Sequence, residues 1–217
     1  MNLPLSNKKS KQAACKILHT DSDCLNTIIQ TLNALLSHVH LDRNIVIVCV
    51  GTDRSTGDCL GPMIGTKLKG LLNGHTSIYG TLDEPVHAMN LRETIEHIKQ
   101  SYTQPFIIAI DACLGQVSSI GCVQIAEGAV KPGAGVNKEL PPVGDIHITG
   151  IVNVGGFMEY FVLQNTRLSL VMRMADVIAD GLSASMKQRY AAVNPSLSML
   201  DEAPLFPQGT RHIQTGR

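Results

Sequence analysis

Continuous runs of β-branched and other apolar residues recur along the chain, bounded by polar residues and glycines. The runs at 45–50, 106–110 and 145–152 predict strands, and the first is apolar enough to lie at the centre of a sheet. Shorter runs predict two further strands, at 77–82 and at 120–126. The last of these follows its predecessor closely enough to form an antiparallel edge.

Apolar residues at helical spacing occupy the segments between these runs. They predict helices over 25–39, from Pro62 to Leu68, and over 156–190. Another helix is predicted between the strands at 77–82 and 106–110, with Asn90 and Glu93 capping it reciprocally. The alternation of strands and helices predicts an α/β protein with a mostly parallel sheet.

The length and composition indicate one domain. A chain of 217 residues that is 44% hydrophobic can bury a substantial core. We predict a flexible N-terminal lead at 1–14, a single domain at 15–192 and a polar C-terminal tail at 193–217. The six cysteines contain no CxxC pair, so we expect neither a disulfide framework nor a zinc ribbon.

The charge balance and the length of the apolar runs argue against nucleic acid and membranes as partners. Lysine plus arginine equal aspartate plus glutamate at 18 each, so the chain lacks the basic excess of a typical nucleic-acid-binding protein. No run reaches the roughly 18 apolar residues that cross a bilayer, and the N-terminus has no apolar signal core. We therefore expect no nucleic acid and no membrane as partners, and a cytoplasmic location.

Two aspartates follow the two strongest strands. Asp58 lies where the loop after 45–50 turns into a helix, and Asp111 comes directly after 106–110. Ligands of open α/β sheets bind beyond the carboxyl ends of strands, so neighbouring strands would bring both acids into one crevice. There they could share a proton and activate water, or hold a divalent metal. Either acid could instead cap a helix or turn.

Three motifs resemble known families. The segments VGTDRSTGDCLGP, IDACLG and PGAGVNK resemble the spore germination protease family and, more closely, the small YyaC-type sporulation proteins. The first two segments are also similar to the nickel–iron hydrogenase maturation peptidases. These resemblances imply a phosphorylase/hydrolase-like, three-layer α/β/α sandwich, and a location in the forespore or spore interior.

The resemblance also implies roles for the two acids. Matched to the germination protease motifs, Asp58 and Asp111 are the catalytic carboxylates, although Gly57 replaces a proline and the extended N-terminal region of that family is lacking. In the hydrogenase peptidases the matching acids bind the metal of the substrate, together with a histidine. The nearest candidate for that third ligand is His147, which gives an alternative metal site of Asp58, Asp111 and His147.

Residues around these motifs are candidates for substrate binding. The glycine-rich segment from Gly133 to Asn137 resembles a loop of the germination protease. Its backbone N–H groups could bind a peptide carbonyl or stabilise an oxyanion. The segment could equally be a flexible connector. Asn153, with Gly155 and Gly156, opens a helix whose N-terminal amides could lie beside the same crevice; equally, it could form only a tight strand-to-helix turn. The candidates are Gly51, Thr52, Asp53, Gly61, Gly133, Gly135, Asn137 and Asn153.

Three hypotheses for the function follow. The leading one is a sporulation-associated, peptidase-like hydrolase that needs no cofactor and uses both aspartates to activate water against a protein or peptide. The second is a metal-dependent amidohydrolase at the same site. The third is a non-catalytic binding or structural protein of the spore, acting as a homo-oligomer or with a peptide in the crevice.

Overall fold

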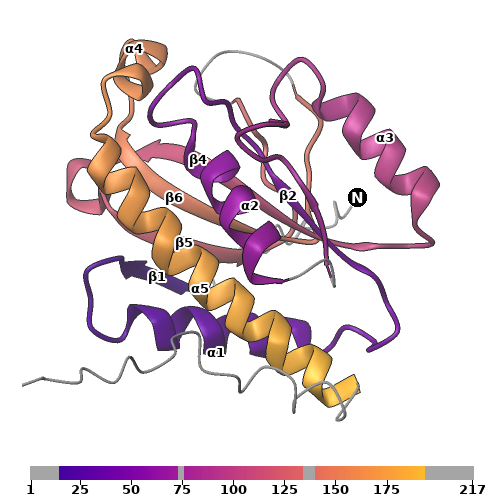
Figure 1. Cartoon of the computed structure of the whole chain (residues 1–217). Coiled ribbons are helices and arrows are strands. Elements are labelled where there is room, and N and C mark those ends of the chain that lie inside the picture. The colour runs from indigo at the N-terminus through magenta and orange to yellow at the C-terminus, as the bar shows by residue number, and fades with distance from the viewer. Residues whose placement is uncertain (1–14, 73–75, 134–139, 194–217) are drawn as a thin grey trace, which may run out of the picture.

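A six-stranded mixed sheet forms the centre of the computed structural model, which describes residues 15–72, 76–133 and 140–193 (Figure 1). The strand order is β1-β5-β6-β4-β2-β3. Strands β6, β4, β2 and β3 are mutually parallel, and β5 is antiparallel to β1 and β6. The strands are β1 (Cys15–Leu18), β2 (Ile45–Cys49), β3 (Ser77–Tyr79), β4 (Phe106–Gly115), β5 (Cys122–Glu127) and β6 (Ile146–Val154).

Helices cover both faces of this sheet. The helices are α1 (Cys24–Leu36), α2 (Leu60–Leu71), α3 (Leu91–Ser101), α4 (Glu159–Gln164) and α5 (Leu168–Val193), with a 3₁₀ turn η1 (Val117–Ser119). On β2, Ile45 and Ile47 pack with α1, α2 and α5, whereas Val46 and Val48 pack with α3 on the opposite face (Figure 1). Both faces of β2 are therefore buried, which explains its continuous apolar run.

The predicted fold class is confirmed: the chain is an α/β protein with a mostly parallel sheet between two helical layers. The predicted lead at 1–14 and the tail beyond Val193 lie outside the described residues, so the domain limits stay a prediction. No helix in the described ranges combines the length and apolarity that a membrane span requires.

Several details differ from the sequence-based prediction. Strand β1 was not predicted, because it has only four residues and Lys16 and Leu18 are exposed. Strand β5 pairs with β1 and β6 rather than with its predecessor β4. The helical pattern over 156–190 divides into α4 and α5. The reciprocal cap was also wrong, because the Asn90 side chain accepts a hydrogen bond from the backbone N–H of His87 instead.

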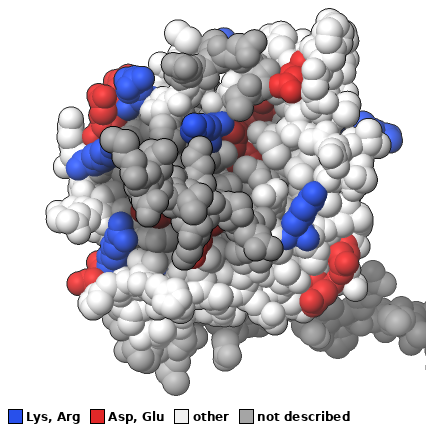
Figure 2. Space-filling model, turned by 180° about the vertical axis from the view of Figure 1, so that it is seen from behind, with Lys and Arg blue, Asp and Glu red and all other residues white. Residues whose placement is uncertain are grey.

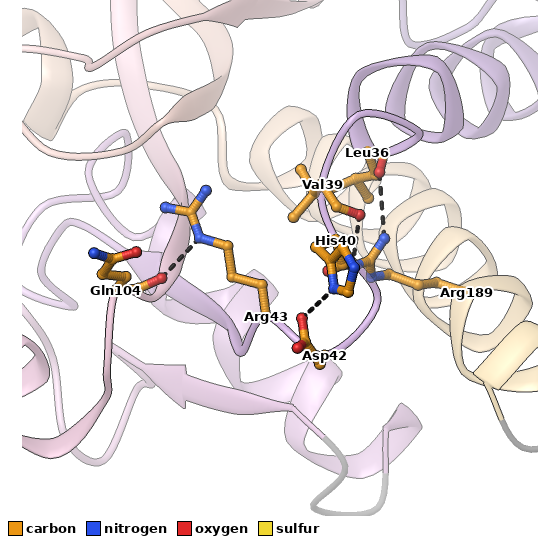
Figure 3. Close-up of polar contacts among 7 residues, drawn as sticks. All are labelled: Leu36, Val39, His40, Asp42, Arg43, Gln104 and Arg189. Carbon is orange, nitrogen blue, oxygen red and sulfur yellow. Dashed lines mark hydrogen bonds and ion pairs between the residues drawn. The ribbon is translucent and has the colours of Figure 1, made fainter.

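Arg189 of α5 holds the C-terminal end of α1 (Figure 3). The last carbonyls of a helix have no partner within the helix. The guanidinium of Arg189 donates to the carbonyl oxygens of Leu36 and Val39, at 3.2 Å each, and to that of His40 at 2.6 Å. One cation thus donates to three carbonyl groups, of which those of Leu36 and His40 also accept from backbone N–H groups, and it joins α5 to the end of α1.

Arg189→Met is expected to lower the free energy of unfolding by about 1–2 kcal/mol, because it removes charged donors from three carbonyls, two of which are half-buried. Urea denaturation measures this change. The matched control is Lys187→Met on the same helix, since Lys187 is exposed. Equal stability of the two variants would show that these hydrogen bonds contribute nothing net.

Candidate functional site

The site opens where β2 and β4 separate. The two strands pair in register from Ile45 with Phe106 to Cys49 with Ile110, and the N–H of Val50 donates to the carbonyl of Ile110 at 2.7 Å. Beyond this point the chain of β2 turns away into the loop that leads to α2. Strand β4 continues to Gly115 with β6 as its partner.

Asp111 lies at this point of separation, inside β4. The prediction that Asp111 directly ends its strand was wrong, because β6 continues to Val154 and pairs with β4 as far as Gly115. Asp111 is the first residue of β4 beyond its pairing with β2. Its position at the mouth of a crevice therefore results from the end of the neighbouring strand.

Backbone hydrogen bonds fix the loop that carries Asp58. The N–H of Thr52 donates to the carbonyl of Asp58 at 3.2 Å, and the N–H of Gly57 donates to the carbonyl of Leu163 in α4 at 2.9 Å. Helix α2 has Cys59 at its N-cap, with no side-chain capping bond. Asp58 therefore does not cap α2, and its carboxylate is available to the crevice.

Both aspartates line one cleft of about 1340 Å³. This volume exceeds that of a typical small-molecule pocket and suits a polypeptide segment. The loop after β2 and β4 form the floor, and α4 with the segment before it forms one side. On the molecular face seen in Figure 2, basic and acidic side chains are scattered, and no continuous basic area is visible among the described residues.

The two carboxyl groups influence each other. Burial raises the pKa of Asp111 well above its usual value, and the negative charge of Asp58 raises it further, while the N–H of Ala112 opposes the shift. Burial also raises the pKa of Asp58, while the nearby Ser55 hydroxyl opposes the shift. Since two close carboxylates in a partly buried cleft resist double ionisation, the pair holds one proton between them over part of the pH range.

Asp111→Asn is expected to raise the melting temperature at neutral pH. A carboxyl whose pKa is raised in the folded state destabilises that state above its unfolded pKa, so the penalty is absent at strongly acidic pH and complete above the folded pKa. We expect a gain of a few degrees at pH 7, since about 1 kcal/mol corresponds to roughly 2–4 °C in a domain of this size. Thermal melts across the pH range measure it; a gain that persists at strongly acidic pH would contradict this cause.

Comparison with known proteins identifies the family. Residues 16–181 match the family described as "Protein of unknown function (DUF1256)". The chain belongs to this family. It is also 53% identical to the protein named "Uncharacterized protein YyaC" of Bacillus subtilis (strain 168), over 181 residues that cover 82% of this chain and 88% of that protein. The resemblance to YyaC-type proteins is thereby confirmed.

A solved structure shares the fold of this DUF1256 protein. The crystal structure of the [NiFe] hydrogenase maturation protease HycI from Thermococcus kodakarensis KOD1 aligns with 72% of this chain and 98% of its own, with a TM-score of 0.51. The sequences are 18% identical over the alignment, so the likeness shows the fold alone. It agrees with the predicted similarity to hydrogenase maturation peptidases.

The predicted substrate-binding residues divide into those in the cleft and those elsewhere. Gly51, Thr52 and Gly133 line the cleft, whereas Asp53 is exposed outside its lining. Gly61 packs against Val50, just after β2, and Asn153 donates to the carbonyl of Val162 and to Thr166, which fastens α4 to the sheet. Gly135 and Asn137 lie outside the described residues.

The structure adds cleft residues that the sequence analysis did not consider. Two cationic side chains, Arg54 and Lys131, line the cleft, as do several apolar residues of the segment before α4 and of α4 itself. The sequence did indicate these apolar residues, because the stretch FMEYF holds three of the eight Phe and Tyr residues of the chain. The sequence analysis placed this stretch only within the helix predicted over 156–190.

The alternative metal site is not assembled. His147 lies opposite Ala109 in the sheet register, two residues before the pairing of Asp111 with Thr149. Its Nδ1 bonds to the carbonyl of Gly128 at 2.7 Å. Among the residues that the structure describes, no three His, Cys, Asp or Glu side chains could hold a metal ion together. Asp58, Asp111 and His147 therefore do not fit a resident metal.

Proposed function

We propose that this DUF1256 protein is a peptidase-like hydrolase that cleaves an amide bond of a protein or peptide. The observation that carries the proposal is the carboxyl pair: Asp58 and Asp111 line one cleft, and the charge of Asp58 raises the pKa of Asp111. One protonated and one ionised carboxyl group are the acid and the base that activation of water requires.

The pKa directions assign a role to each acid. We assign the proton to Asp111, because both burial and the charge of Asp58 raise its pKa, and the role of base to Asp58, whose pKa is raised by burial alone. Water loses a proton to Asp58 as its oxygen attacks the carbonyl carbon, and Asp111 donates its proton to the carbonyl oxygen. When the C–N bond breaks, Asp58 gives its proton to the leaving amine, and a hydroxyl group of the tetrahedral intermediate returns a proton to Asp111, so the pair again holds one proton.

The biological setting of the proposal is sporulation. The motifs around Asp58 and Asp111 resemble those of the spore germination protease, and the fold is shared with a maturation protease, HycI. These similarities support cleavage of a protein substrate in the developing or germinating spore. The proposed reaction requires neither a metal nor another cofactor.

The proposal is tested by comparing new protein N-termini in sporulating cells. Bacillus subtilis lacking its YyaC relative would receive either this chain or its Asp58→Asn variant at equal abundance. Mass spectrometry of labelled N-termini is expected to find cleavage products that depend on Asp58 and so to name the substrate. Identical sets of N-termini in both strains would overturn the enzymatic proposal and favour a binding or structural role.

A further inference from the structure

Inside the cleft, one edge of β4 has no partner strand in the part of the chain that the structure describes. Backbone groups of successive residues in a strand point alternately to its two sides. The carbonyl of Ile110 faces β2, where it accepts from Val50, and the carbonyl of Gly115 faces β6, where it accepts from Gly155. Ala112 and Leu114 therefore direct their backbone groups away from β6, toward the side that β2 has left, and both line the cleft.

These backbone groups lack a strand partner among the described residues. Pairing of β4 with β2 ends at Ile110, and no other described strand lies on that side. The N–H of Ala112 interacts with the carboxylate of Asp111. The Ala112 carbonyl and the N–H and carbonyl of Leu114 then remain without a strand partner among the described residues. Half-buried backbone groups of this kind require a hydrogen-bonding partner, and an extended chain supplies one.

The free groups match the backbone of a parallel strand. In a parallel pair, one residue donates its N–H to the carbonyl of one neighbour and accepts from the N–H two residues further along. Ala112 and Leu114 present this combination directly beside Asp111. An added segment would thus continue the position of β2 in the sheet and pass its amide bonds along the two catalytic carboxyl groups.

The walls of the cleft favour apolar side chains on such a segment. Phe157 is 81% exposed and Phe161 57% exposed on one side, and Met89 is 83% exposed on another, and all three line the cleft. Large apolar residues this exposed mark a binding surface when they converge on one groove. Side chains of an added strand point alternately to opposite faces, so they would meet these walls in turn.

We propose that the cleft binds its substrate by strand addition: an extended, unfolded polypeptide segment with large apolar side chains pairs in parallel with the free edge of β4. This inference rests on the proposed function and deepens it. The edge from Asp111 to Gly115 admits a segment of about five residues, roughly 16 Å long. Recognition is through the backbone, so the substrate requires an unfolded region and apolar character rather than one fixed sequence.

The first test uses β-casein, a disordered protein, and the Asp58→Asn variant, which binds without cleaving. Amide hydrogen exchange, resolved by residue with NMR, is expected to slow at least about tenfold at Leu114 when casein binds, because that N–H gains a partner. The N–H of Cys113 faces β6 and serves as the internal control. Absence of casein binding, or binding with unchanged exchange at Leu114, would overturn the inference.

The second test removes the donor. Leu114→Pro deletes the N–H that faces the cleft and leaves the pairing with β6 intact, since proline is tolerated at an unpaired edge. Casein affinity is expected to fall at least about tenfold. Gln116→Pro is the matched control, because Gln116 is exposed, lies outside the cleft and has φ −75°, which suits proline.

The two proposals fail in different ways. If the unmodified protein cleaves casein and Leu114→Pro cleaves it equally well, strand addition is wrong and the peptidase proposal stands. If casein binds with protection of Leu114 but is never cleaved, strand addition stands and the peptidase proposal is wrong for this substrate class. Should Leu114→Pro fail to fold, the exchange measurement on Asp58→Asn decides the inference alone.

Discussion

Asn substitution of either Asp58 or Asp111 is expected to reduce casein hydrolysis by about 10²–10⁴-fold, the usual contribution of a general acid or base. Asparagine keeps the size and hydrogen bonding of the side chain but can neither accept nor donate the catalytic proton. Release of peptide fragments from fluorescein-labelled casein measures the rate. Asp58→Asn removes the base together with the charge that raises the pKa of Asp111, and Asp111→Asn removes the acid.

The double variant sharpens this expectation. Groups that act as one unit are not additive, so Asp58→Asn combined with Asp111→Asn should be little slower than either single variant. Asp83→Asn is the matched control, because Asp83 is exposed and lies outside the cleft lining. Loss of activity in Asp83→Asn, or multiplication of the two single effects in the double variant, would contradict the shared-proton mechanism.

The sheet was predictable because burial on both faces leaves a strong pattern. Ile45 to Cys49 is apolar at every position, and the loop and helix that follow β2 give the βαβ order directly. β1 was not predictable, because its pairing with β5 joins residues more than a hundred positions apart and leaves no local pattern. Long-range pairing of short edge strands depends on tertiary context, which a single sequence does not show.

The two acids of the site were predictable from the order of strands and helices, whereas the apolar residues that form the walls of the cleft were not. The position of Asp58 after β2, and of Asp111 where β4 extends past β2, follows from topology, but their charge coupling depends on the depth of the cleft. Ala112 and Leu114 lack a strand partner on one side, among the described residues, because β4 extends beyond the end of β2. Strand ends are the least certain part of a sequence-based prediction. The apolar walls could not be separated from core residues by periodicity alone.

Gly61→Ala is expected to lower the free energy of unfolding by about 3 kcal/mol, at the upper end of the range for overpacking. A Cβ at Gly61 would lie 2.1 Å from the carbonyl oxygen of Val50 and 3.0 Å from its nitrogen. These are backbone atoms of the chain that leaves β2, so no side chain can rotate to make room. Thermal denaturation should show a fall in melting temperature of roughly 6–12 °C.

Gly70→Ala is the matched control within α2, because a Cβ there meets no atom within 4 Å. Alanine at this exposed helical position should stabilise the protein by up to about 1 kcal/mol. The pair also decides the role of Gly61, since close contact between α2 and β2 sets the position of the Asp58 loop. A Gly61→Ala variant with unchanged melting temperature and weakened casein binding would make Gly61 a substrate-binding residue, as the sequence first predicted, rather than the packing contact that the structure shows.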